Sequence, residues 1–444
     1  MTNINQTGVW APFTFAGTGD HLYVRGSITN IGSVTTAVVT SGQAGNIISI
    51  GGQVASFGAG DAIRMTGGGT IINNGLIAGA ITSDAAVSLT NAGRFVGFFA
   101  STQSGPGAGS RIINKSSMML AESVGASAHV AGALISLGGA DDIVVNRGRM
   151  MGDIWLGEGN NIFDNRGGDL MGLVHGGSGN DSYMFDTQVI IDDTGGIDTI
   201  IARSSFVLAN GFENLTLGGF GNFTGTGNTA GNSLTGNAGS NLLSGLGGND
   251  TLAGGGGADT LDGGTNNDSL QGQNGADRMT GGYGNDTMSG GDGSDVLTGD
   301  TGSDLMAGDI GADTLYGGIG ADTMAGGDGA DLLTGGAFGT DSMTGGLGAD
   351  TFIYVSANDS FATLAADVIT DFEVGIDKID LSALVAGDLL FMASDPFSPT
   401  DASVRVAGSG GNTLVSIDLD FNGTADMQIV LTGVVALTAG DFAL

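Results

Sequence analysis

The sequence predicts an all-β protein built as a solenoid, in which short strands stack in successive coils around a narrow apolar core. Three observations predict it: a strict nine-residue repeat in the C-terminal half, a looser repeat in the N-terminal half, and a composition that combines 87 glycines with 41% hydrophobic residues. That much glycine is typical of collagen or of disordered chains. The regularly spaced apolar residues supply surface to bury, however, and indicate a folded repeat protein.

The first expected element is a segment over residues 1–21 that precedes the repeats and is apolar in "VWAPFTF" (9–15). A solenoid ends in strands with unpaired N–H and C=O groups, and such edges pair with other chains unless they are covered. We therefore expect this segment to dock on a second copy of the chain and to give a head-to-tail contact. The alternative is that it folds back as a small cap on a monomer.

The second element is an irregular β-helix over residues 22–200. Similar heptads recur with a central asparagine, at Asn30, Asn73, Asn91, Asn114, Asn146 and Asn165, and with Ile50 in the asparagine place of one further copy. The spacing is mostly near 20 residues, as expected for one coil per repeat. Glycine-rich turns between these heptads place Asp142, Asn161 and Asp181 at nearly equal steps, and "GGSGNDSYM" (176–184) is a full nonapeptide with Asp181 as a candidate metal ligand.

The third element is a tighter solenoid over residues 201–353, which contains nonapeptides such as "GGYGNDTMS" (281–289) from Gly227 onwards. The glycine-rich half of each unit predicts a turn, because glycine adopts positive φ at little cost. The other half predicts a short strand whose central residue, at position eight, points inward. That residue is Leu, Met or Phe from Leu252 to Phe352, so two units make one coil and stacked coils bury one apolar stripe.

The residues at position six of the units are the candidate metal ligands. It is Asn at Asn232 and Asn241 and aspartate in every later unit, and the aspartates are Asp250, Asp259, Asp268, Asp277, Asp286, Asp295, Asp304, Asp313, Asp322, Asp331, Asp341 and Asp350. Every second unit presents its turn on the same edge, so carboxylates line up about 4.8 Å apart and repel one another. Ca²⁺ takes six to eight hard oxygen ligands, including carboxylates and backbone carbonyls. The glycines expected to offer such carbonyls are Gly248, Gly257, Gly284, Gly293, Gly302, Gly311, Gly320 and Gly329.

These units resemble the haemolysin-type calcium-binding repeats of RTX proteins, whose consensus is G-G-x-G-x-D-x-U-x. The resemblance covers residues 227–353 and implies a right-handed parallel β-roll with multiple Ca²⁺ ions held between successive turns. Some units depart from the pattern, with Asn266 at position four and Gln273, Asp300 and Asp309 at position two, and we expect weaker or altered sites there. Residues 195–219 resemble the lead-in of such arrays, and Asp198 within them is expected to contribute little to calcium affinity.

The fourth element is a β-rich cap over residues 354–444. "DVITDFEVGIDKIDLSAL" (367–384) resembles the domain that follows RTX arrays in serralysin-like exported proteins, and "DFAL" (441–444) resembles an uncleaved C-terminal type I secretion signal. "DLDFNGTADM" (418–427) resembles an EF-hand-like loop with candidate ligands Asp418, Asp420, Asn422 and Asp426. Position twelve of that loop is Ile429 instead of Glu, so a calcium site and a solvated turn both stay open.

Charge, cysteine content and hydropathy exclude several classes of function. The net charge is −34, and residues 204–444 contribute −28 of it, with 3 basic and 31 acidic residues. Such a field repels nucleic acid and anionic lipid and attracts cations. The chain has no cysteine, no N-terminal signal peptide is evident, and no run of about 18 apolar residues predicts a membrane span.

A search for catalytic residues gives no constellation. H-E-x-x-H and G-x-S-x-G are absent, the two lysines, Lys115 and Lys378, lie in no phosphate-binding loop, and the three histidines, His21, His129 and His175, have no partner at metal-ligand spacing. The arginines Arg147, Arg149 and Arg166 fall at comparable coil positions and could form a cationic ridge for uronates. A solvated ladder of arginines is the interpretation that we favour.

The sequence therefore predicts a secreted calcium-binding structural protein of the bacterial surface or extracellular matrix, such as a fibre, surface layer or adhesin, without enzymatic activity. Its expected partners are calcium ions, a second copy of itself, surface polysaccharide and the type I secretion apparatus. The alternative is a polysaccharide-binding or polysaccharide-modifying protein, similar to a lyase or epimerase, that uses the N-terminal β-helix.

Overall fold

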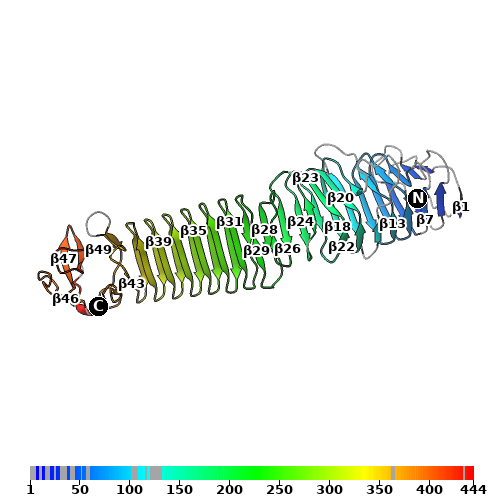
Figure 1. The fold of residues 1–444 in the computed structure, drawn as a ribbon. Coiled ribbons are helices and arrows are strands. Elements are labelled where there is room, and N and C mark those ends of the chain that lie inside the picture. The colour runs from blue at the N-terminus through cyan, green and yellow to red at the C-terminus, as the bar shows by residue number, and fades with distance from the viewer. Residues whose placement is uncertain are drawn as a thin grey trace. The chain divides into compact units, whose positions relative to one another are not determined.

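The chain divides into two compact units, residues 1–203 and 204–444, in the computed structural model shown in Figure 1. The structure describes residues 7–9, 13–15, 21–24, 27–30, 38–40, 46–51, 53–56, 61–101, 108–115, 118–120, 133–187, 189–193, 195–361, 366–385, 387, 389–433 and 436–444. Apart from one short 3₁₀ helix, η1 (Ala439–Asp441), the regular elements are strands, and the predicted all-β parallel solenoid is confirmed.

The N-terminal unit has three parallel sheets, and each full coil gives one strand to each of them. The first sheet has the order β1 (Thr7–Val9), β4 (Ser27–Asn30), β7 (Gln53–Ser56), β10 (Leu76–Ala78), β13 (Arg94–Val96), β16 (Met118–Leu120), β19 (Arg149–Met151) and β22 (Asp169–Met171). The second has the order β2 (Phe13–Phe15), β5 (Val38–Thr40), β8 (Ile63–Met65), β11 (Ile81–Ser83), β14 (Phe99–Ser101), β17 (Ala133–Ser136), β20 (Asp153–Glu158), β23 (Leu173–Ser178) and β25 (Ile190–Asp192). The third runs through β3 (His21–Val24), β6 (Asn46–Ile50), β9 (Gly69–Asn73), β12 (Val87–Asn91), β15 (Ala108–Asn114), β18 (Asp141–Asn146), β21 (Ile162–Asp164), β24 (Ser182–Phe185) and β26 (Thr199–Ala202).

The described parts of residues 1–21 belong to these sheets. β1 pairs in parallel with β4, and β2 pairs in parallel with β5, so the coils begin before residue 22. The first coil therefore consists of β1, β2 and β3, and the segment expected to precede the repeats contributes two of its strands. Among the described residues, β1 and β2 are the terminal strands of their sheets.

The recurring asparagines of the N-terminal unit form a buried hydrogen-bonded ladder. The side-chain Nδ2 of Asn73 donates to Oδ1 of Asn91 at 2.7 Å, and the same bond continues through Asn114 and Asn146 to Asn165 at 2.7–3.0 Å. A side-chain amide both donates and accepts a hydrogen bond, so each buried asparagine finds its partners in the neighbouring coils. Ile50, in the place of the missing asparagine, is buried, and the side chain of Asn30 lies outside the described residues.

The C-terminal unit has two long parallel sheets, whose strands follow one another in Figure 1 from β28 to β43. One has the order β27 (Phe206–Val207), β29 (Thr224–Thr226), β31 (Leu242–Gly247), β33 (Thr260–Thr265), β35 (Arg278–Tyr283), β37 (Val296–Thr301), β39 (Thr314–Ile319), β41 (Leu332–Ala337), β43 (Thr351–Ile353), β45 (Lys378–Asp380) and β50 (Phe442–Ala443). The other runs through β28 (Asn214–Leu217), β30 (Ser233–Thr235), β32 (Thr251–Gly256), β34 (Ser269–Asn274), β36 (Thr287–Asp292), β38 (Leu305–Ile310), β40 (Thr323–Asp328), β42 (Ser342–Leu347), β44 (Asp367–Ile369) and β49 (Met427–Leu431).

The position-eight residues fill the space between these two sheets, as predicted. From Leu252 to Phe352 each of them is at most 1% exposed. The strands on either side keep a register of 18 residues, except that the unit with the inserted Phe338 needs 19. Two nonapeptides therefore make one coil, and the stack buries a single stripe of Leu, Met and Phe side chains.

Residues after β43 add a small β-hairpin layer to the end of the roll. β48 (Asn412–Asp418) pairs antiparallel with β47 (Ser403–Ser409) and with β49, and β46 (Leu390–Phe391) pairs with β47. β44 and β45 meanwhile continue the two sheets of the roll. The cap is thus attached to the roll through the same parallel hydrogen bonding that joins the coils.

The turns of the roll place position two in the left-handed region whatever residue occupies it. Gln273, Asp300 and Asp309 have φ values of 75°, 68° and 73°, against 105° for Gly282 and Gly291. Asn266, at position four, also has a positive φ of 79°. The strand register continues across these units, so the four departures from the repeat do not alter the course of the backbone.

Candidate metal centre

The position-six aspartates are buried at the start of the strands and form two columns. In each column, the backbone N–H of one aspartate donates to Oδ1 of the aspartate one coil further on, at 2.7–2.9 Å. The first column runs through Asn232, Asp250, Asp268, Asp286, Asp304, Asp322 and Asp341, and the second through Asn241, Asp259, Asp277, Asp295, Asp313, Asp331 and Asp350. Each carboxylate is therefore held in place by one of its two oxygens.

The second oxygen of every one of these twelve aspartates is buried without a hydrogen-bond partner. Leaving a buried charged acceptor unsatisfied costs several kcal/mol per group. A dozen such atoms in a regular row indicate that a ligand belongs beside them, because native proteins rarely tolerate even a few.

The glycine at position one leaves room for that ligand. A Cβ added to Gly263 would lie 2.5 Å from Oδ2 of Asp268 and 2.7 Å from the carbonyl oxygen of Gly281. Gly263 does not have a positive φ, so the position needs glycine for space. Two acceptor oxygens thus face the same small volume, an arrangement that suits a cation.

The two asparagine units show the arrangement that needs no ion. Nδ2 of Asn232 donates to the carbonyl oxygen of Phe212 at 3.1 Å, and Nδ2 of Asn241 donates to that of Gly221 at 3.3 Å. In both residues Oδ1 accepts a backbone N–H four residues upstream, at 2.7 Å. The side-chain oxygen that faces the position-one glycine thus has a backbone N–H partner in the asparagine units, whereas the corresponding Oδ2 of the aspartate units has none.

Burial makes the charged form of these carboxylates costly. It raises the pKa of Asp268 to about 7, with further contributions from Asp250 and Asp286, and it raises the pKa of Asp259 to about 6. A divalent cation beside Oδ2 would reverse this effect, because it favours the ionised carboxylate. The donor set of carboxylate and carbonyl oxygens fits Ca²⁺, whose preferred ligands are hard oxygens.

The sequence analysis missed two parts of this arrangement. The position-one glycines lie beside Oδ2 of the aspartates, but the sequence analysis did not name them. Glycine occurs at position one of every unit, and this regularity was a usable signal. The columns also extend to Asp367, which accepts the N–H of Asp341 at 2.9 Å, and to Asp377, which accepts that of Asp350 at 3.0 Å.

The position-four glycines lie where neighbouring turns of the roll approach closely. Gly284 has a φ of 136°, and a Cβ on it would collide with the carbonyl oxygen of Asn266 in the preceding coil. These glycines therefore let consecutive turns approach closely. Their predicted contribution of carbonyl ligands stays a prediction.

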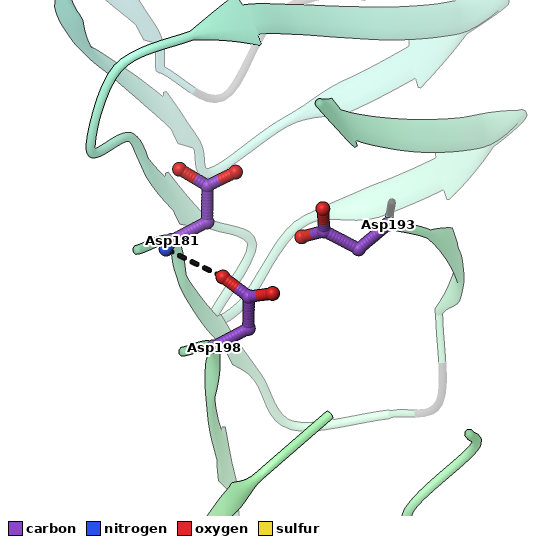
Figure 2. A group of neighbouring side chains, drawn as sticks. All are labelled: Asp181, Asp193 and Asp198. Atoms are coloured by element: carbon purple, nitrogen blue, oxygen red, sulfur yellow. Dashed lines mark hydrogen bonds between the residues drawn. The ribbon is translucent and has the colours of Figure 1, made fainter. Parts of the chain in front are cut away.

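A related ladder in the N-terminal unit ends in an acidic cluster. The N–H of Asp142 donates to Asn161 at 2.9 Å, that of Asn161 to Asp181 at 2.6 Å, and that of Asp181 to Asp198 at 2.7 Å. Figure 2 shows Asp181 and Asp198 joined by this bond, with Asp193 facing them. One carboxylate oxygen of each lies within 4.8 Å of the other two.

Asp198 continues this ladder, and its expected small contribution to calcium affinity stays a prediction. Burial, and then the nearby Asp193 and Asp198, raise the pKa of Asp181 to about 7. The hydroxyl of Tyr183 donates to both Asp193 and Asp181. Asp181, Asp193 and Asp198 form a candidate cation site of the N-terminal unit.

The EF-hand-like loop connects the two hairpin strands β48 and β49. Asp418, Asp420 and Asp426 each offer an oxygen within 4.8 Å of the other two. The buried Asp418 accepts the N–H groups of Phe421 and Gly423, both at 2.9 Å. The fourth predicted ligand, Asn422, accepts the N–H of Thr424 at 2.8 Å. These bonds are those of a self-contained turn, while the three neighbouring carboxylates offer the oxygens of a cation site, so both interpretations stay open.

The arginines of the predicted cationic ridge are paired with carboxylates. Although burial alone would raise it, hydrogen bonds from Arg166 and Arg147 hold the pKa of Asp164 below its usual range. Arg149 pairs with Asp169 at 3.2 Å. The ridge therefore offers little free positive charge to a uronate.

Of the three histidines, the structure describes the side chain of His175. His175 stacks on Trp155 with ring centroids 3.6 Å apart, and its Nδ1 lies 3.3 Å from Oδ2 of Asp192. The side chain of His21 and all of His129 lie outside the described part of the chain. The described chain also has no helix that is long and apolar enough to cross a membrane.

Three comparisons relate this architecture to known proteins. The chain is 35% identical to Serralysin A of Dickeya chrysanthemi over 100 residues, 20% of this chain and 19% of the relative, and 35% identical to Serralysin C of the same organism over 91 residues, with the same coverage. It thus spans about a fifth of the length of these curated relatives. Among solved structures, the solution structure of the AlgE6R3 subunit from the Azotobacter vinelandii mannuronan C5-epimerase matches with 25% identity and a TM-score of 0.21, covering 40% of this chain and 77% of that one.

The family described as peptidase M10 serralysin C terminal matches residues 119–444, which include the end of the N-terminal unit, the whole roll and the cap. The match extends over the unsatisfied aspartate columns and the residues that continue them after the nonapeptides end. The chain belongs to the serralysin C-terminal family and is a β-roll repeat protein of the RTX type.

Proposed function

We propose that this protein is an exported structural protein whose C-terminal unit folds by binding calcium. The observation that carries the proposal is the row of twelve buried carboxylate oxygens without partners, each beside the gap left by a position-one glycine. The serralysin C-terminal family implies both calcium binding and secretion, which supports the same conclusion. Binding energy at such sites is folding energy, because the ligand geometry does not exist in the unfolded chain.

The calcium dependence fits export. Extracellular-type calcium sites bind in roughly the 10⁻⁴–10⁻³ M range, far above the calcium available in a cytosol. The C-terminal unit carries most of the net charge of −34 and would stay expanded until calcium neutralises it. Release through a type I apparatus before folding follows from this proposal.

The structural role rests on the N-terminal edge. In the described residues, β1 and β2 have a neighbour on one side only, while the C-terminal end of the roll is covered by the hairpin cap. An open edge is a template for pairing with another chain. We infer that a second copy docks there, head to tail, and that the protein forms fibres or a surface layer. Catalysis is no part of this proposal.

The experiment that tests the calcium proposal is a titration of the purified full-length chain after chelation, read by bound ion count and circular dichroism. We expect a large gain of β-structure as calcium binds. Identical spectra with and without calcium, or binding that leaves the roll unchanged, would contradict it.

Self-association is tested separately by light scattering in calcium. We expect the mass to rise with concentration, and the paired substitutions Gly8→Lys and Thr14→Lys on the edge strands to reduce it, because charged edges resist pairing. The same pair at Gly256 and Thr298 within the roll serves as the control. A full-length chain that stays monomeric at every concentration would contradict the fibre proposal and leave the calcium proposal intact.

A further inference from the structure

An asparagine followed by a glycine is the step of a chain that most readily loses its side-chain amide, because glycine has no Cβ to keep its amide nitrogen away from the asparagine side chain. The sequence has four such steps, Asn74–Gly75, Asn210–Gly211, Asn274–Gly275 and Asn422–Gly423. The reaction needs a glycine N–H that can turn towards Cγ of the preceding asparagine. The hydrogen bonds of the four glycines therefore decide which step reacts.

Three of the four glycine N–H groups are held by hydrogen bonds. Gly75 donates to Oδ1 of Asn73 at 3.1 Å, and Gly423 donates to Oδ2 of Asp418 at 2.9 Å. Gly275 donates to a backbone carbonyl of the next coil at 2.8 Å, between β34 and β36. Each of these nitrogens must lose a hydrogen bond before it can attack, and the one in the roll must also open a coil.

The fourth step lies on an exposed turn at the start of the roll, between β27 and β28. Asn210 and Gly211 are both exposed, and Gly211 has a φ of 97°, which suits glycine. The N–H of Phe212 closes the turn by donating to the carbonyl oxygen of Ala209 at 3.3 Å. Within the described chain, neither the N–H of Gly211 nor the side chain of Asn210 has a hydrogen-bond partner. Both reacting groups are therefore open to water and free to move.

We propose that Asn210 is a site of spontaneous covalent modification, at which the side-chain amide is lost through a succinimide. The amide nitrogen of Gly211 attacks Cγ of Asn210, so a C–N bond forms and the bond between Cγ and Nδ2 breaks. The side-chain NH₂ leaves as ammonia with the proton of the Gly211 amide. This chemistry goes beyond the proposed function and does not require it.

Water then opens the ring and gives two products. Cleavage at Cγ gives aspartate, whereas cleavage at the main-chain carbonyl carbon of Asn210 gives isoaspartate, in which the chain continues through Cβ and Cγ. Both products carry a new negative charge, and the reaction consumes only water, with no oxidant or reductant.

The turn is bonded to the first asparagines of the roll. Nδ2 of Asn228 donates to the carbonyl oxygens of Ala209 and Phe212 at 3.0 and 2.8 Å, and Nδ2 of Asn232 donates to that of Phe212 at 3.1 Å. An isoaspartate adds a backbone atom between the two carbonyls, so the spacing that lets Asn228 reach both is lost. We expect the isoaspartyl chain to be loosened at the start of the roll.

The inference is tested by ageing the folded full-length chain in calcium and mapping its peptides by mass spectrometry. We expect Asn210 to be converted at least about tenfold faster than Asn74, Asn274 or Asn422, because the other three glycines must first break a hydrogen bond. The rate should rise in alkaline buffer, since the attacking nitrogen must lose its proton. In denaturant the four steps should react at similar rates, and this unfolded reference separates the effect of structure from that of local sequence.

Two matched variants locate the reaction. Asn210→Gln should abolish conversion at this turn, because the longer side chain would have to form a larger, less favourable ring. Asn274→Gln, at the corresponding step of the roll, should leave the release of ammonia from the folded chain unchanged. Conversion of Asn210 that is no faster than that of Asn274 in the folded chain would overturn the site.

A third variant separates the new charge from the lengthened backbone. Asn210→Asp carries the charge without the added atom, so hydrogen exchange over residues 228–235 should match that of the unaged chain. The isolated isoaspartyl fraction should exchange faster there, because Asn228 loses its paired carbonyls. Equal exchange in the isoaspartyl fraction and the unaged chain would overturn the proposed effect on the roll.

Discussion

The two units of this protein stack parallel strands in the same way but treat buried polar groups differently. In the N-terminal unit the long ladder is made of asparagines, from Asn73 to Asn165, and each amide satisfies the next. In the C-terminal unit the ladder is made of aspartates, and each leaves one oxygen without a partner. The N-terminal ladder is complete within the chain, whereas under the proposed function the C-terminal ladder is completed by a cation.

Under the proposed function, one backbone plan gives both a unit that folds without a ligand and a unit that needs one. Asn232 and Asn241, at the start of the roll, already adopt the satisfied arrangement with donated amide hydrogens. Under that proposal, an aspartate instead of an asparagine at position six makes the coil depend on a bound cation, because the carboxylate cannot donate the hydrogen bond that the amide makes. The position-one glycine beside the carboxylate supplies the space for that ligand.

The largest expected effect is regional loss of structure on chelation. Hydrogen exchange on the full-length chain in excess chelator should show residues 204–444 exchanging freely, while residues 61–101 keep their protection. Restored calcium should restore protection in the roll. Equal loss of protection in both regions would remove the proposed distinction between the two ladders.

Acid should partly replace calcium in the C-terminal unit. Burial raises the pKa of Asp250, Asp295 and Asp313 to about 6 in the folded chain, above the usual value of 3.8. A carboxyl whose pKa is raised on folding favours the folded state at low pH and loses that contribution as pH rises through its folded pKa.

In chelator, the C-terminal unit should therefore gain structure between about pH 7 and about pH 5. Circular dichroism and hydrogen exchange check this expectation. A calcium-free roll that is least ordered near the lower pH would contradict it.

The next effect comes from placing a carboxylate in the asparagine ladder. Asn114→Asp replaces an amide that donates to Asn146 at 2.8 Å, so two acceptors would face one another. We expect a loss of about 3 kcal/mol in the stability of the N-terminal unit, as for an uncompensated buried charge.

The matched change in the roll is Asp295→Asn, which keeps Oδ1 as acceptor for the N–H of Asp277. It should cost bound calcium while leaving the metal-free roll no less stable. Thermal unfolding of both variants, each with and without calcium, measures the contrast. Similar losses in both variants would show that the ladders are equivalent.

Filling the position-one space should have a smaller effect. A Cβ on Gly290 would press on Oδ2 of Asp295 and lie 2.7 Å from the carbonyl oxygen of Gly308. Gly290→Ala should weaken calcium binding and cost about 2 kcal/mol through overpacking. Gly256→Ala is the control, because its Cβ would lie 3.7 Å from Cα of Ala238, which is ordinary van der Waals contact. Calorimetric titration giving equal losses for the two variants would disprove a special role for position one.

The smallest effect concerns the left-handed turn positions. Gln273 has a φ of 75°, a conformation that costs a side-chain-bearing residue about 1 kcal/mol relative to glycine. Gln273→Gly should therefore raise the stability of the calcium-loaded roll by about that amount. Unfolding in denaturant with calcium present measures it, and a destabilised variant would show that the glutamine side chain contributes contacts of its own.

The sequence predicted the parts of the molecule that obey a fixed period. The nine-residue spacing places Asp286 and Asp304 on one edge and Met288 and Met306 in the core, because two units make one coil. The sequence did not predict that Asp367 and Asp198 continue the ladders. Their steps of 26 and 17 residues break the period, and only the folded chain brings them into place.

Other features were beyond a pattern of spacings. The recurring asparagines of the N-terminal half were visible, but their amide-to-amide bonds depend on the orientation of side chains in neighbouring coils. The neutralised arginines likewise depend on Asp164 lying between Arg147 and Arg166 in space.

The fixed register of the roll determines how it should respond to force. Coils of 18 residues are joined only to their neighbours, so a molecule pulled from its two ends should lose one coil at a time. Each released coil would lengthen the chain by roughly 60 Å, with an ion set free at each step. The single coil lengthened to 19 residues by Phe338 would give one slightly longer step and mark the direction of rupture. The roll would thus lengthen under tension in a series of nearly equal steps, each of which requires the loss of bound calcium.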